Sequence, residues 1–347
     1  MNKDFKDLVW NVSEEEYRKY NALSYSLIST YQSEGFSCLD PKKPKKFSPS
    51  FSFGSAVDTL ATESIAKFNE KFCIIDDIKV TPSNKIISDV LYSRYKKESF
   101  KDYTDEEITL IAKEFNIFQR LKDPISKIRV DSTENYYNLL VTSGNRTVIS
   151  KEECQEIFDT YDALKSTPCT RDFFVEDNPF TKIKKYNQVK FKAILDNNIE
   201  YKCMFDIIMV DYDKKIIIPV DLKTSSAAEY KFYENFVAFH YDIQARLYTR
   251  ILEKIIMADD YFRDFKITNF VFICISRYRK QPLKWVFDLS KEKGNISIPA
   301  YTKLVEFKDP EILGKEIHEY LSKEVTNPKE ITEFGYNNIV EFIKNNL

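Results

Sequence analysis

The chain has 347 residues, long enough for one large domain or two and for a substantial buried core. Hydrophobic residues make up 43% of it and charged residues 31%, as in an ordinary soluble globular protein. The formal net charge is −2, so there is no overall attraction to nucleic acid, and any DNA binding must come from local basic clusters.

Cysteine and histidine usage argues against several metal and redox classes. The six cysteines are scattered without a C-x-x-C spacing, which disfavours a zinc ribbon, an iron–sulfur cluster and a disulfide framework. Two histidines leave little material for a His-based zinc site. The first residues contain no apolar signal region, and no apolar run reaches transmembrane length. We therefore expect a protein of the cytoplasm, in a bacterium or a phage-infected cell, without a membrane partner.

The first half of the sequence is predicted to be largely helical. Ser13 followed by three glutamates marks the start of a short helix, and a second helix is expected from about Ser24 to Gln32. Residues 38–50, rich in Pro, Lys and Ser, are typical of a loop. The spacing of apolar residues predicts further helices over residues 53–67 and 150–165. Two or three helices are expected within residues 84–122, one of them over 105–118.

Strands are concentrated in the second half. They are predicted from about residue 182 to 220, over 269–276 and over 283–289, with a strong helix over 241–257 between them. The tail, residues 309–347, is predicted to be helical with a break near Pro328. The expected fold is α/β, a central mixed β-sheet flanked by helices with a largely helical N-terminal half, in a single domain over residues 1–347.

Residues 201–225 carry the clearest local signal. Two runs rich in β-branched and aromatic residues, 205–210 and 216–220, are separated by polar residues typical of a turn, which predicts a β-hairpin. If Asp213 and Lys214 form a two-residue loop, Tyr212 faces Lys215. The numbers of any two residues that face each other across the hairpin then add up to the same value.

That register places Asp206 directly opposite Asp221. Opposed residues on one face of a hairpin have Cβ atoms roughly 5 Å apart, and two like charges at that distance destabilise the sheet. A divalent cation removes the conflict, because both carboxylates can reach a hard ion that prefers oxygen ligands. Lys223, two residues past Asp221, projects from the same face. Two acids and a lysine on one face indicate a metal-assisted hydrolytic centre.

Two alternatives stay open for this hairpin. A three-residue loop would shift the register by one and send the two aspartates to opposite faces. Pro219 lacks an N–H and could introduce a bulge. The ribbon could also be an exposed antiparallel pair with solvated Asp and Lys side chains.

Further candidates lie beyond the hairpin. Gln244 and Tyr248 are four residues apart on one face of the predicted helix, where a glutamine could hydrogen-bond a nucleophilic water or a DNA phosphate. The alternative is a surface pair with Tyr248 packed in the core. Three basic runs are candidate phosphate contacts or ordinary solvated surface: Lys42–Lys46, Lys182–Lys185 and Arg277–Lys280.

The order of four short motifs resembles a known family. GSAVD (54–58), FD (205–206), DLKTS (221–225) and QARLY (244–248) together resemble the PD-(D/E)XK nucleases. The branch most similar is that of phage and prophage exonucleases related to exonuclease VIII (RecE), with RecB-type nuclease domains and lambda exonuclease more distant. The resemblance covers roughly residues 10–300. It implies a restriction-endonuclease-like core over about 181–300 plus the 54–58 helix.

The resemblance implies roles for individual residues. Asp206 and Asp221 would be the metal-binding and catalytic acids for Mg²⁺ or Mn²⁺, Lys223 the catalytic lysine, and the backbone carbonyl of Leu222 a further metal ligand. Asp58 stands where the first motif usually ends in a histidine that touches the metal, and as an oxygen ligand it is expected to bind the same ion.

Nucleic-acid contacts are implied for Gln244 and Tyr248, which would touch DNA or order the site. Thr224 and Ser225 could donate hydrogen bonds to a DNA phosphate, or could cap the next helix. Relatives often carry a glutamate on the strand before the first acid, where this chain offers Gln188 or Lys190.

The function expected from the resemblance is a metal-dependent DNA exonuclease that leaves 5′-phosphate ends and acts in phage-type recombination or DNA processing. Expected partners are DNA, further copies of the chain in a ring, and a single-strand-annealing recombination protein. Asp58 and the missing glutamate keep open a degenerate nuclease fold that binds nucleic acid or a partner without cutting. A restriction-type endonuclease is the third alternative.

Overall fold

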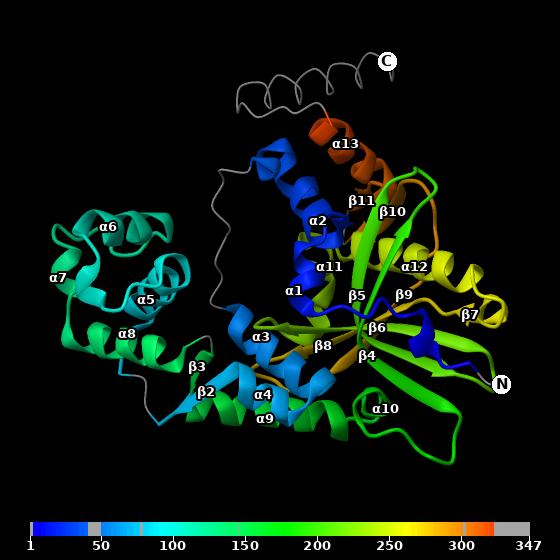
Figure 1. The fold of residues 1–347 in the computed structure, drawn as a ribbon, viewed down its shortest axis with the longest axis horizontal. Coiled ribbons are helices and arrows are strands. Elements are labelled where there is room, and N and C mark those ends of the chain that lie inside the picture. Colours follow the sequence, from blue (N-terminus) through cyan, green and yellow to red (C-terminus); the bar gives the residue numbers. More distant parts are fainter. Residues whose placement is uncertain (1–2, 41–49, 77–78, 145, 301–302, 323–347) are drawn as a thin grey trace. The chain divides into compact units, whose positions relative to one another are not determined.

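The computed structural model describes residues 3–40, 50–76, 79–144, 146–300 and 303–322 (Figure 1). Its α-helices are α1 (Glu14–Lys19), α2 (Tyr25–Glu34), α3 (Ser50–Asp58), α4 (Ile65–Lys71), α5 (Pro82–Tyr95), α6 (Asp105–Glu114), α7 (Ile125–Ile128), α8 (Asp131–Ser143), α9 (Lys151–Ser166), α10 (Arg171–Phe174), α11 (Phe232–Ala238), α12 (Tyr241–Met257) and α13 (Pro310–Ser322). Its strands are β1 (Leu23–Ser24), β2 (Phe72–Ile75), β3 (Thr147–Ser150), β4 (Ile183–Ile194), β5 (Glu200–Asp211), β6 (Ile216–Ser225), β7 (Lys266–Ile267), β8 (Phe270–Ser276), β9 (Leu283–Phe287), β10 (Ile296–Ala300) and β11 (Lys303–Phe307).

The chain divides into two compact units, each with its own hydrophobic core. Unit 1 consists of residues 1–45 and 163–347, and unit 2 consists of residues 46–162. A mixed β-sheet with helices lies in unit 1, so the chain is α/β as the sequence predicts. The expectation of one domain over residues 1–347 stays a prediction.

The sheet of unit 1 runs in the order β1-β5-β6-β8-β9. β4 pairs with the edge of β5 opposite to β6, and the short strand β7 pairs with β6. β4, β5 and β6 are antiparallel neighbours, whereas β6 and β8 are parallel. A parallel pair needs a crossover connection, and here α11 and α12 lie in that connection. The parallel arrangement places the carboxyl ends of β6 and β8 at the same edge.

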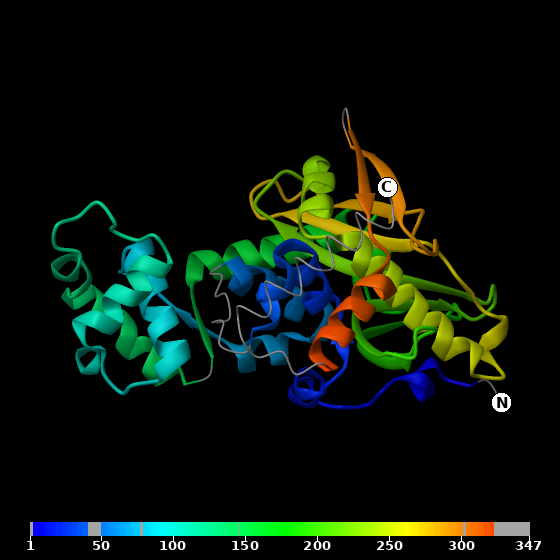
Figure 2. The same ribbon diagram turned by 90° about the horizontal axis from the view of Figure 1, so that it is seen from above.

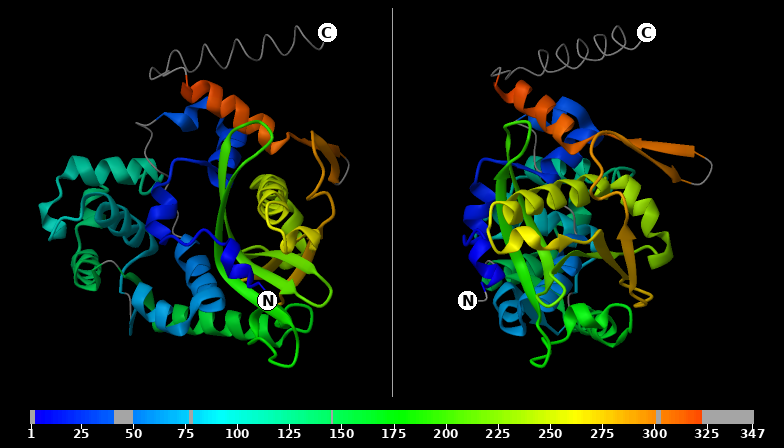
Figure 3. Two further views of the ribbon diagram at one scale, coloured as in Figure 1. Left: turned by 45° about the vertical axis from the view of Figure 1, so that its right-hand side comes forward. Right: turned by 90° about the vertical axis from the view of Figure 1, so that its right-hand side faces the viewer.

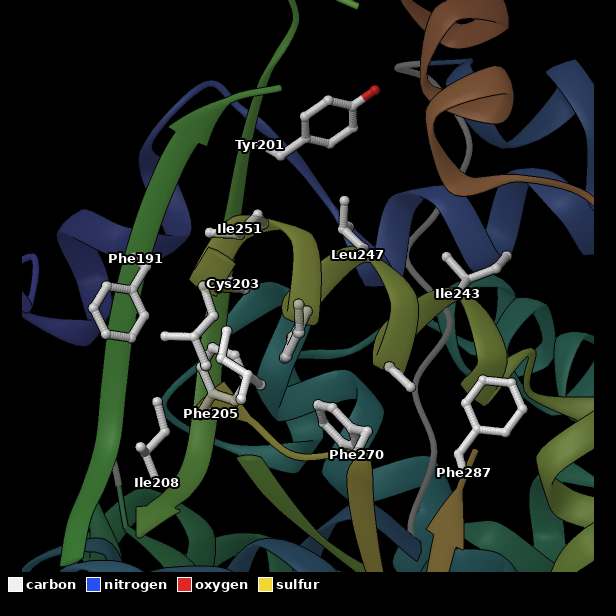
Figure 4. Close-up of a cluster of buried hydrophobic side chains, with 14 of the residues drawn as sticks. Phe191, Tyr201, Cys203, Phe205, Ile208, Ile243, Leu247, Ile251, Phe270 and Phe287 are labelled. Atoms are coloured by element: carbon white, nitrogen blue, oxygen red, sulfur yellow. The ribbon is translucent and has the colours of Figure 1, made fainter. Parts of the chain in front are cut away.

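Helix α12 covers one face of this sheet. In the left view of Figure 3 it is seen nearly end-on (yellow) within the curve of the β4–β5 ribbon (green). Its apolar side chains, including Ile243, Leu247 and Ile251, belong to the same buried cluster as Phe205 and Phe270 of the sheet (Figure 4). Burial of large apolar and aromatic side chains of this kind contributes about 1.5–3 kcal/mol each. The core therefore fixes α12 against the strands that carry the predicted site.

A smaller element extends the C-terminal part of unit 1. β10 and β11 form an antiparallel hairpin, drawn in orange in Figure 2, and α13 follows it. A Cβ at Gly314 of α13 would overlap the ring and hydroxyl of Tyr201 in β5, so glycine permits this close approach. The predicted helical tail is found over 310–322, and residues 323–347 lie outside the described residues.

Unit 2 is built from α3 to α8, most of α9, and a two-stranded parallel sheet of β2 and β3. Its core gathers buried side chains of α5, α6 and α8, among them Leu91, Ile111 and Tyr137. The hydroxyls of Tyr103 and Tyr137 are 2.7 Å apart, and each also lies within hydrogen-bond distance of a backbone carbonyl, that of Leu91 for Tyr103 and that of Lys97 for Tyr137. Their buried hydroxyls therefore have partners.

Several predicted helices are shorter than the sequence pattern indicates. The single helix expected over 53–67 is interrupted, because α3 passes into a π-helical turn at Thr59–Glu63 and α4 starts afresh at Ile65. Ser64 accepts a hydrogen bond from the Lys67 N–H and caps that new start. Of the predicted loop over 38–50, residues 41–49, which include the basic run Lys42–Lys46, lie outside the described residues.

Candidate functional site

The β5–β6 hairpin has the register that the sequence predicts. Ile207 pairs with Val220 and Asp211 with Ile216, so opposed residue numbers keep the same sum. The connection differs from the predicted two-residue loop, because residues 212–215 all belong to the turn. Adding one residue on each side of the loop leaves the register unchanged. Ile208 pairs with Pro219 in the same register, so the bulge considered for this position is absent from the described ladder.

Asp206 lies where β5 and β6 separate. Pairing between β5 and β6 ends at Ile207 of β5. Pairing between β5 and β1 begins only at Lys202. The Asp206 carboxylate accepts a hydrogen bond from the Leu222 N–H at 2.8 Å, just beyond the end of the ladder. The hairpin register, continued by one residue, places Asp206 at the level of Asp221. The sheet therefore opens at the two predicted acids.

Asp221 is buried, and both of its carboxylate oxygens face polar groups. Lys223 Nζ lies 2.6 Å from Oδ2, and the Gln244 amide of α12 donates to Oδ1 at 2.5 Å. Asp221 exposes 3% of its surface and Gln244 also 3%. A buried charge needs such partners, because desolvation without them costs several kcal/mol. The structure thus brings Asp221, Lys223 and Gln244 together into one cluster.

The Lys223 ammonium is held by charge and by an aromatic ring. Its Nζ lies 4.5 Å from the centre of the Tyr241 ring, within the range of a cation–π contact. Burial disfavours its charged form, but the Asp221 carboxylate, with smaller contributions including Asp206, outweighs burial and raises the pKa of Lys223 above its usual value. The cluster therefore keeps a positive charge beside two acids.

The remaining predicted contacts of β6 are partly exposed. The Ser225 hydroxyl accepts hydrogen bonds from the Ala227 N–H and the Asn235 amide, at 2.9 and 3.0 Å. These contacts fix the segment after β6 but do not cap a helix, because the helical turn at Glu229–Lys231 and α11 both lack a side-chain cap hydrogen bond. Thr224 is half-buried on the same strand. Their predicted hydrogen bonds to a DNA phosphate stay predictions.

Tyr248 is placed in the core. It exposes 7% of its surface, and its ring contacts Phe205 and Phe270 at centroid distances of 5.0 and 6.3 Å. Gln244, one turn earlier, faces Asp221. Gln244 therefore contacts a predicted site residue, whereas Tyr248 is packed in the core, as in the alternative considered for it. Their predicted roles at a DNA site stay predictions.

Asp58 belongs to unit 2, where it ends α3 and its backbone carbonyl accepts a hydrogen bond from Thr62 at 2.8 Å. Its predicted role as a metal ligand stays a prediction. Gln188, considered in place of the upstream glutamate, lies on β4 between the pairs Asn187–Ile207 and Val189–Phe205, at the level of Asp206.

Sequence reasoning missed the backbone conformation at Gln188. Its φ is +50°, which is uncommon for a residue other than glycine and unusual inside a strand. Such conformations cost of order 1–3 kcal/mol and gather at functional sites. A strand pattern does not reveal them, because the alternation of side chains on either side looks ordinary.

The donor set fits a hard divalent cation. The described residues contain no group of three or more His, Cys, Asp and Glu side chains that could hold a metal. Mg²⁺ is nonetheless bound commonly by one or two carboxylates, with water and substrate phosphates as the other ligands. Asp206 and Asp221 supply such a pair, and Asp221 Oδ2 would have to exchange its contact with Lys223 for the ion.

Fold and site together define an α/β protein with an acid–lysine–glutamine cluster at the point where its sheet opens. Comparison with protein-family models gives no match, and comparison with curated proteins gives none either. The resemblance to PD-(D/E)XK nucleases therefore rests on the four motifs and stays a prediction. Within the described residues, no helix has the length and apolar character needed to cross a bilayer.

Proposed function

We propose that this protein is a metal-dependent DNA exonuclease that hydrolyses phosphodiester bonds with Mg²⁺ or Mn²⁺. The observation that carries the proposal is the opening of the β5–β6 hairpin at Asp206 and Asp221, with Lys223 beside them. Structural ion pairs are common, but two acids and a lysine at a break in a buried ladder form an unusual group. Such groups are typical of sites rather than of cores.

Asp206 and Asp221 would hold the ion, and the Leu222 carbonyl is a third candidate ligand from the nuclease resemblance. When bound, the metal supplies Lewis-acid polarisation of the phosphate and a lowered pKa for a coordinated water. Gln244 orients the Asp221 carboxylate through its hydrogen bond. Lys223 contributes a fixed positive charge that stabilises charge developing on the phosphate oxygens. A lysine suits this role because its ammonium is a compact point charge, here held between Asp221 and the Tyr241 ring.

A second candidate is a nuclease fold that binds nucleic acid or a partner without cutting. One observation favours it: both oxygens of Asp221 already have close contacts, to Lys223 and Gln244. If these contacts do not open, the carboxylate cannot accept an ion. The two candidates make opposite predictions for metal-dependent cleavage.

The test compares linear duplex DNA with closed circular DNA of the same sequence, in Mg²⁺, in Mn²⁺ and in EDTA. Progressive shortening of the linear form alone supports the exonuclease. Binding without cleavage supports the degenerate fold, and discrete fragments from circles support a restriction-type endonuclease. If the protein neither binds nor cleaves DNA, both nucleases are rejected, and the second candidate is reduced to a fold that binds a partner other than nucleic acid.

The variants are Asp221→Asn and Lys223→Met, with Asp196→Asn as the matched control. Asp196 is an exposed acid of unit 1 that pairs with Lys254 and Lys293 at the surface. We expect the two site variants to lose cleavage by at least about 100-fold, the scale of removing one catalytic group, while the control retains it. Equal activity in all three proteins would refute the assignment.

A further inference from the structure

The turn between β8 and β9 is basic and carries exposed aromatic surface. Residues 277–284 contain Arg277, Arg279, Lys280 and Lys284 and no acidic residue. Tyr278 exposes 70% of its surface. The Arg279 guanidinium lies 5.7 Å from the centre of the ring of Tyr230, which is itself 58% exposed. Cations and exposed tyrosine side chains therefore occur together in and beside this turn.

This turn is held in a defined conformation by a buried carboxylate. Glu229 exposes 2% of its surface and accepts hydrogen bonds from the Ser276 and Gln281 N–H groups at 3.0 and 2.8 Å. It also lies 3.6 Å from Arg279. The same carboxylate thus joins the turn to the segment that carries Tyr230. A fixed turn loses less conformational entropy when it binds a ligand.

The turn lies at the same edge of the sheet as the end of β6. The Arg277 N–H donates to the Ser225 carbonyl at 2.9 Å. Ser225 is four residues past Asp221, a distance of about 13 Å along a strand. In open α/β sheets ligands bind outside the carboxyl ends of parallel strands, which is where β6 and β8 both end. A strand reaching the acid–lysine cluster would pass close to this surface.

The basic run at Lys182–Lys185 supplies a comparison surface. Its three lysines each pair with an acid: Lys182 with Asp213, Lys184 with Asp4 and Lys185 with Asp177. In the 277–284 segment, Arg279 lies beside Glu229, which is buried.

We propose that Tyr230, Tyr278 and the cations of residues 277–280 form a stacking platform for a single-stranded segment of DNA. Bases of a single strand can stack on exposed tyrosine rings, while Arg and Lys contact the phosphates. In a duplex the bases are stacked on one another, so their faces are not open to these rings. The inference rests on the proposed function only for the choice of DNA, because the platform itself needs no cleavage and no metal.

The test measures binding of a fluorescein-labelled oligodeoxythymidine by anisotropy in EDTA, so that hydrolysis plays no part. We expect Tyr278→Ala to weaken binding about fivefold or more, the scale of one stacked base. Tyr278→Phe should bind like wild type because it keeps the ring. Phe180→Ala is the matched control, since Phe180 is 95% exposed beside the acid-paired run, and it should leave binding unchanged.

A second probe tests whether the bases matter. An oligonucleotide of the same length with abasic sites should bind wild type more weakly, and the Tyr278→Ala substitution should then have little further effect. The proposal is overturned if the wild-type protein does not bind the oligonucleotide, if Tyr278→Ala binds as tightly as Phe180→Ala, or if blunt duplex DNA shows the same loss. Cleavage is judged by its own assay, so either proposal can fail while the other stands.

Discussion

The Asp221 carboxylate is almost fully buried, and its charge is tolerated because Lys223 and Gln244 both face it. Such a pair contributes little net stability, since desolvation consumes most of the Coulomb energy. Removing either Asp221 or Lys223 alone should lower stability, because the charge of the remaining side chain then has no counter-charge from the pair. The site residues should therefore show strong energetic coupling.

A double-mutant cycle measures that coupling. We expect Lys223→Met to lower the free energy of unfolding by about 2–3 kcal/mol, because Asp221 loses its counter-charge. Adding Asp221→Asn should recover most of this loss, since the double variant has no buried charge at the pair. Urea unfolding of the four proteins gives the coupling energy. Additive effects of the two substitutions would contradict a direct interaction.

Asp242, in the first turn of α12, is a buried acid with a different environment. It is fully buried, and within the described residues no side chain donates a hydrogen bond to its carboxylate, whereas the backbone N–H groups of Asp242 and Ile243 act on it. Burial raises the pKa of Asp242 from 3.8 to about 7, against the opposing charge of Arg246. The folded protein therefore keeps this proton up to about pH 7, whereas the unfolded chain releases it near pH 4. The stability contributed by protonated Asp242 is lost as the pH rises between these values.

Replacement of Asp242 by Asn should remove this pH dependence. At about 1.4 kcal/mol per pKa unit, the variant should be more stable than wild type at pH 8 by up to about 4 kcal/mol, and nearly equal to it at about pH 4. Urea midpoints at the two pH values provide the measurement. Asp172→Asn, at an exposed acid, should differ from wild type by no more than about 0.5 kcal/mol at either pH. The same difference at both pH values for Asp242→Asn would refute the assignment.

At the scale of elements, the sequence is informative where a local pattern decides the structure. The helix predicted over 241–257 has those bounds as α12, and the hairpin has the register predicted by centring its turn on Asp213 and Lys214. Ser13 caps α1 by accepting from the Glu16 N–H, as the acidic first turn indicates. Each feature depends on residues close together in the chain.

Elements that depend on distant partners, or whose local sequence is atypical of a strand, were not predicted. β2 and β3 pair in parallel although they are about 75 residues apart, and each is only four residues long. The β10–β11 hairpin includes Pro299, which disfavours a strand in a sequence pattern. The positive φ of Gln188 and the contact of Gln244 with Asp221 likewise arise from tertiary packing. The predicted register gives the positions of Asp206 and Asp221. The side chain that contacts Asp221 from outside the sheet, Gln244, belongs to α12 and could not be placed from the register.

An ionic clamp joins α12 to the segment before α13. Asp309, which exposes 4% of its surface, accepts two hydrogen bonds from Arg250 at 2.7 Å and lies 3.1 Å from Arg246. The Gly294 N–H also donates to it at 2.6 Å. One carboxylate therefore holds two buried guanidinium groups, a geometry that favours bidentate arginine contacts.

Removal of this carboxylate should be costly. We expect Asp309→Asn to lower the free energy of unfolding by about 3–5 kcal/mol, because the buried Arg246 loses its acid partner and Arg250 keeps only Glu311. Hydrogen exchange should accelerate first in α13 and the β10–β11 hairpin, which the clamp joins to α12. Asp196→Asn, at an exposed ion pair, should cost no more than about 1 kcal/mol. Similar costs for the two variants would show that the clamp is not a buried charge network.

At the scale of the whole molecule, composition did not reveal the division into two units. The sequence contains no low-complexity linker, and helices alone do not show which residues share a core. The core of unit 2 is formed by side chains of residues 87–148, whereas that of unit 1 draws on the N-terminal residues and on residues 186–317. Asp206, Asp221 and Lys223 all belong to unit 1.

A fragment spanning residues 46–166, which keeps α9 complete, should therefore fold without the rest of the chain. Its length of about 120 residues is in the range of independent domains, and its core includes Leu91, Ile111 and Tyr137 from three helices. Far-UV circular dichroism should show a helical protein, and urea should unfold it in one cooperative transition. The same fragment carrying Ile111→Asp should be unfolded, because the substitution buries an unpaired charge. A fragment with as little helical ellipticity as the Ile111→Asp control, or one that loses its ellipticity gradually in urea, would show that the unit 2 core needs residues of unit 1 for its stability.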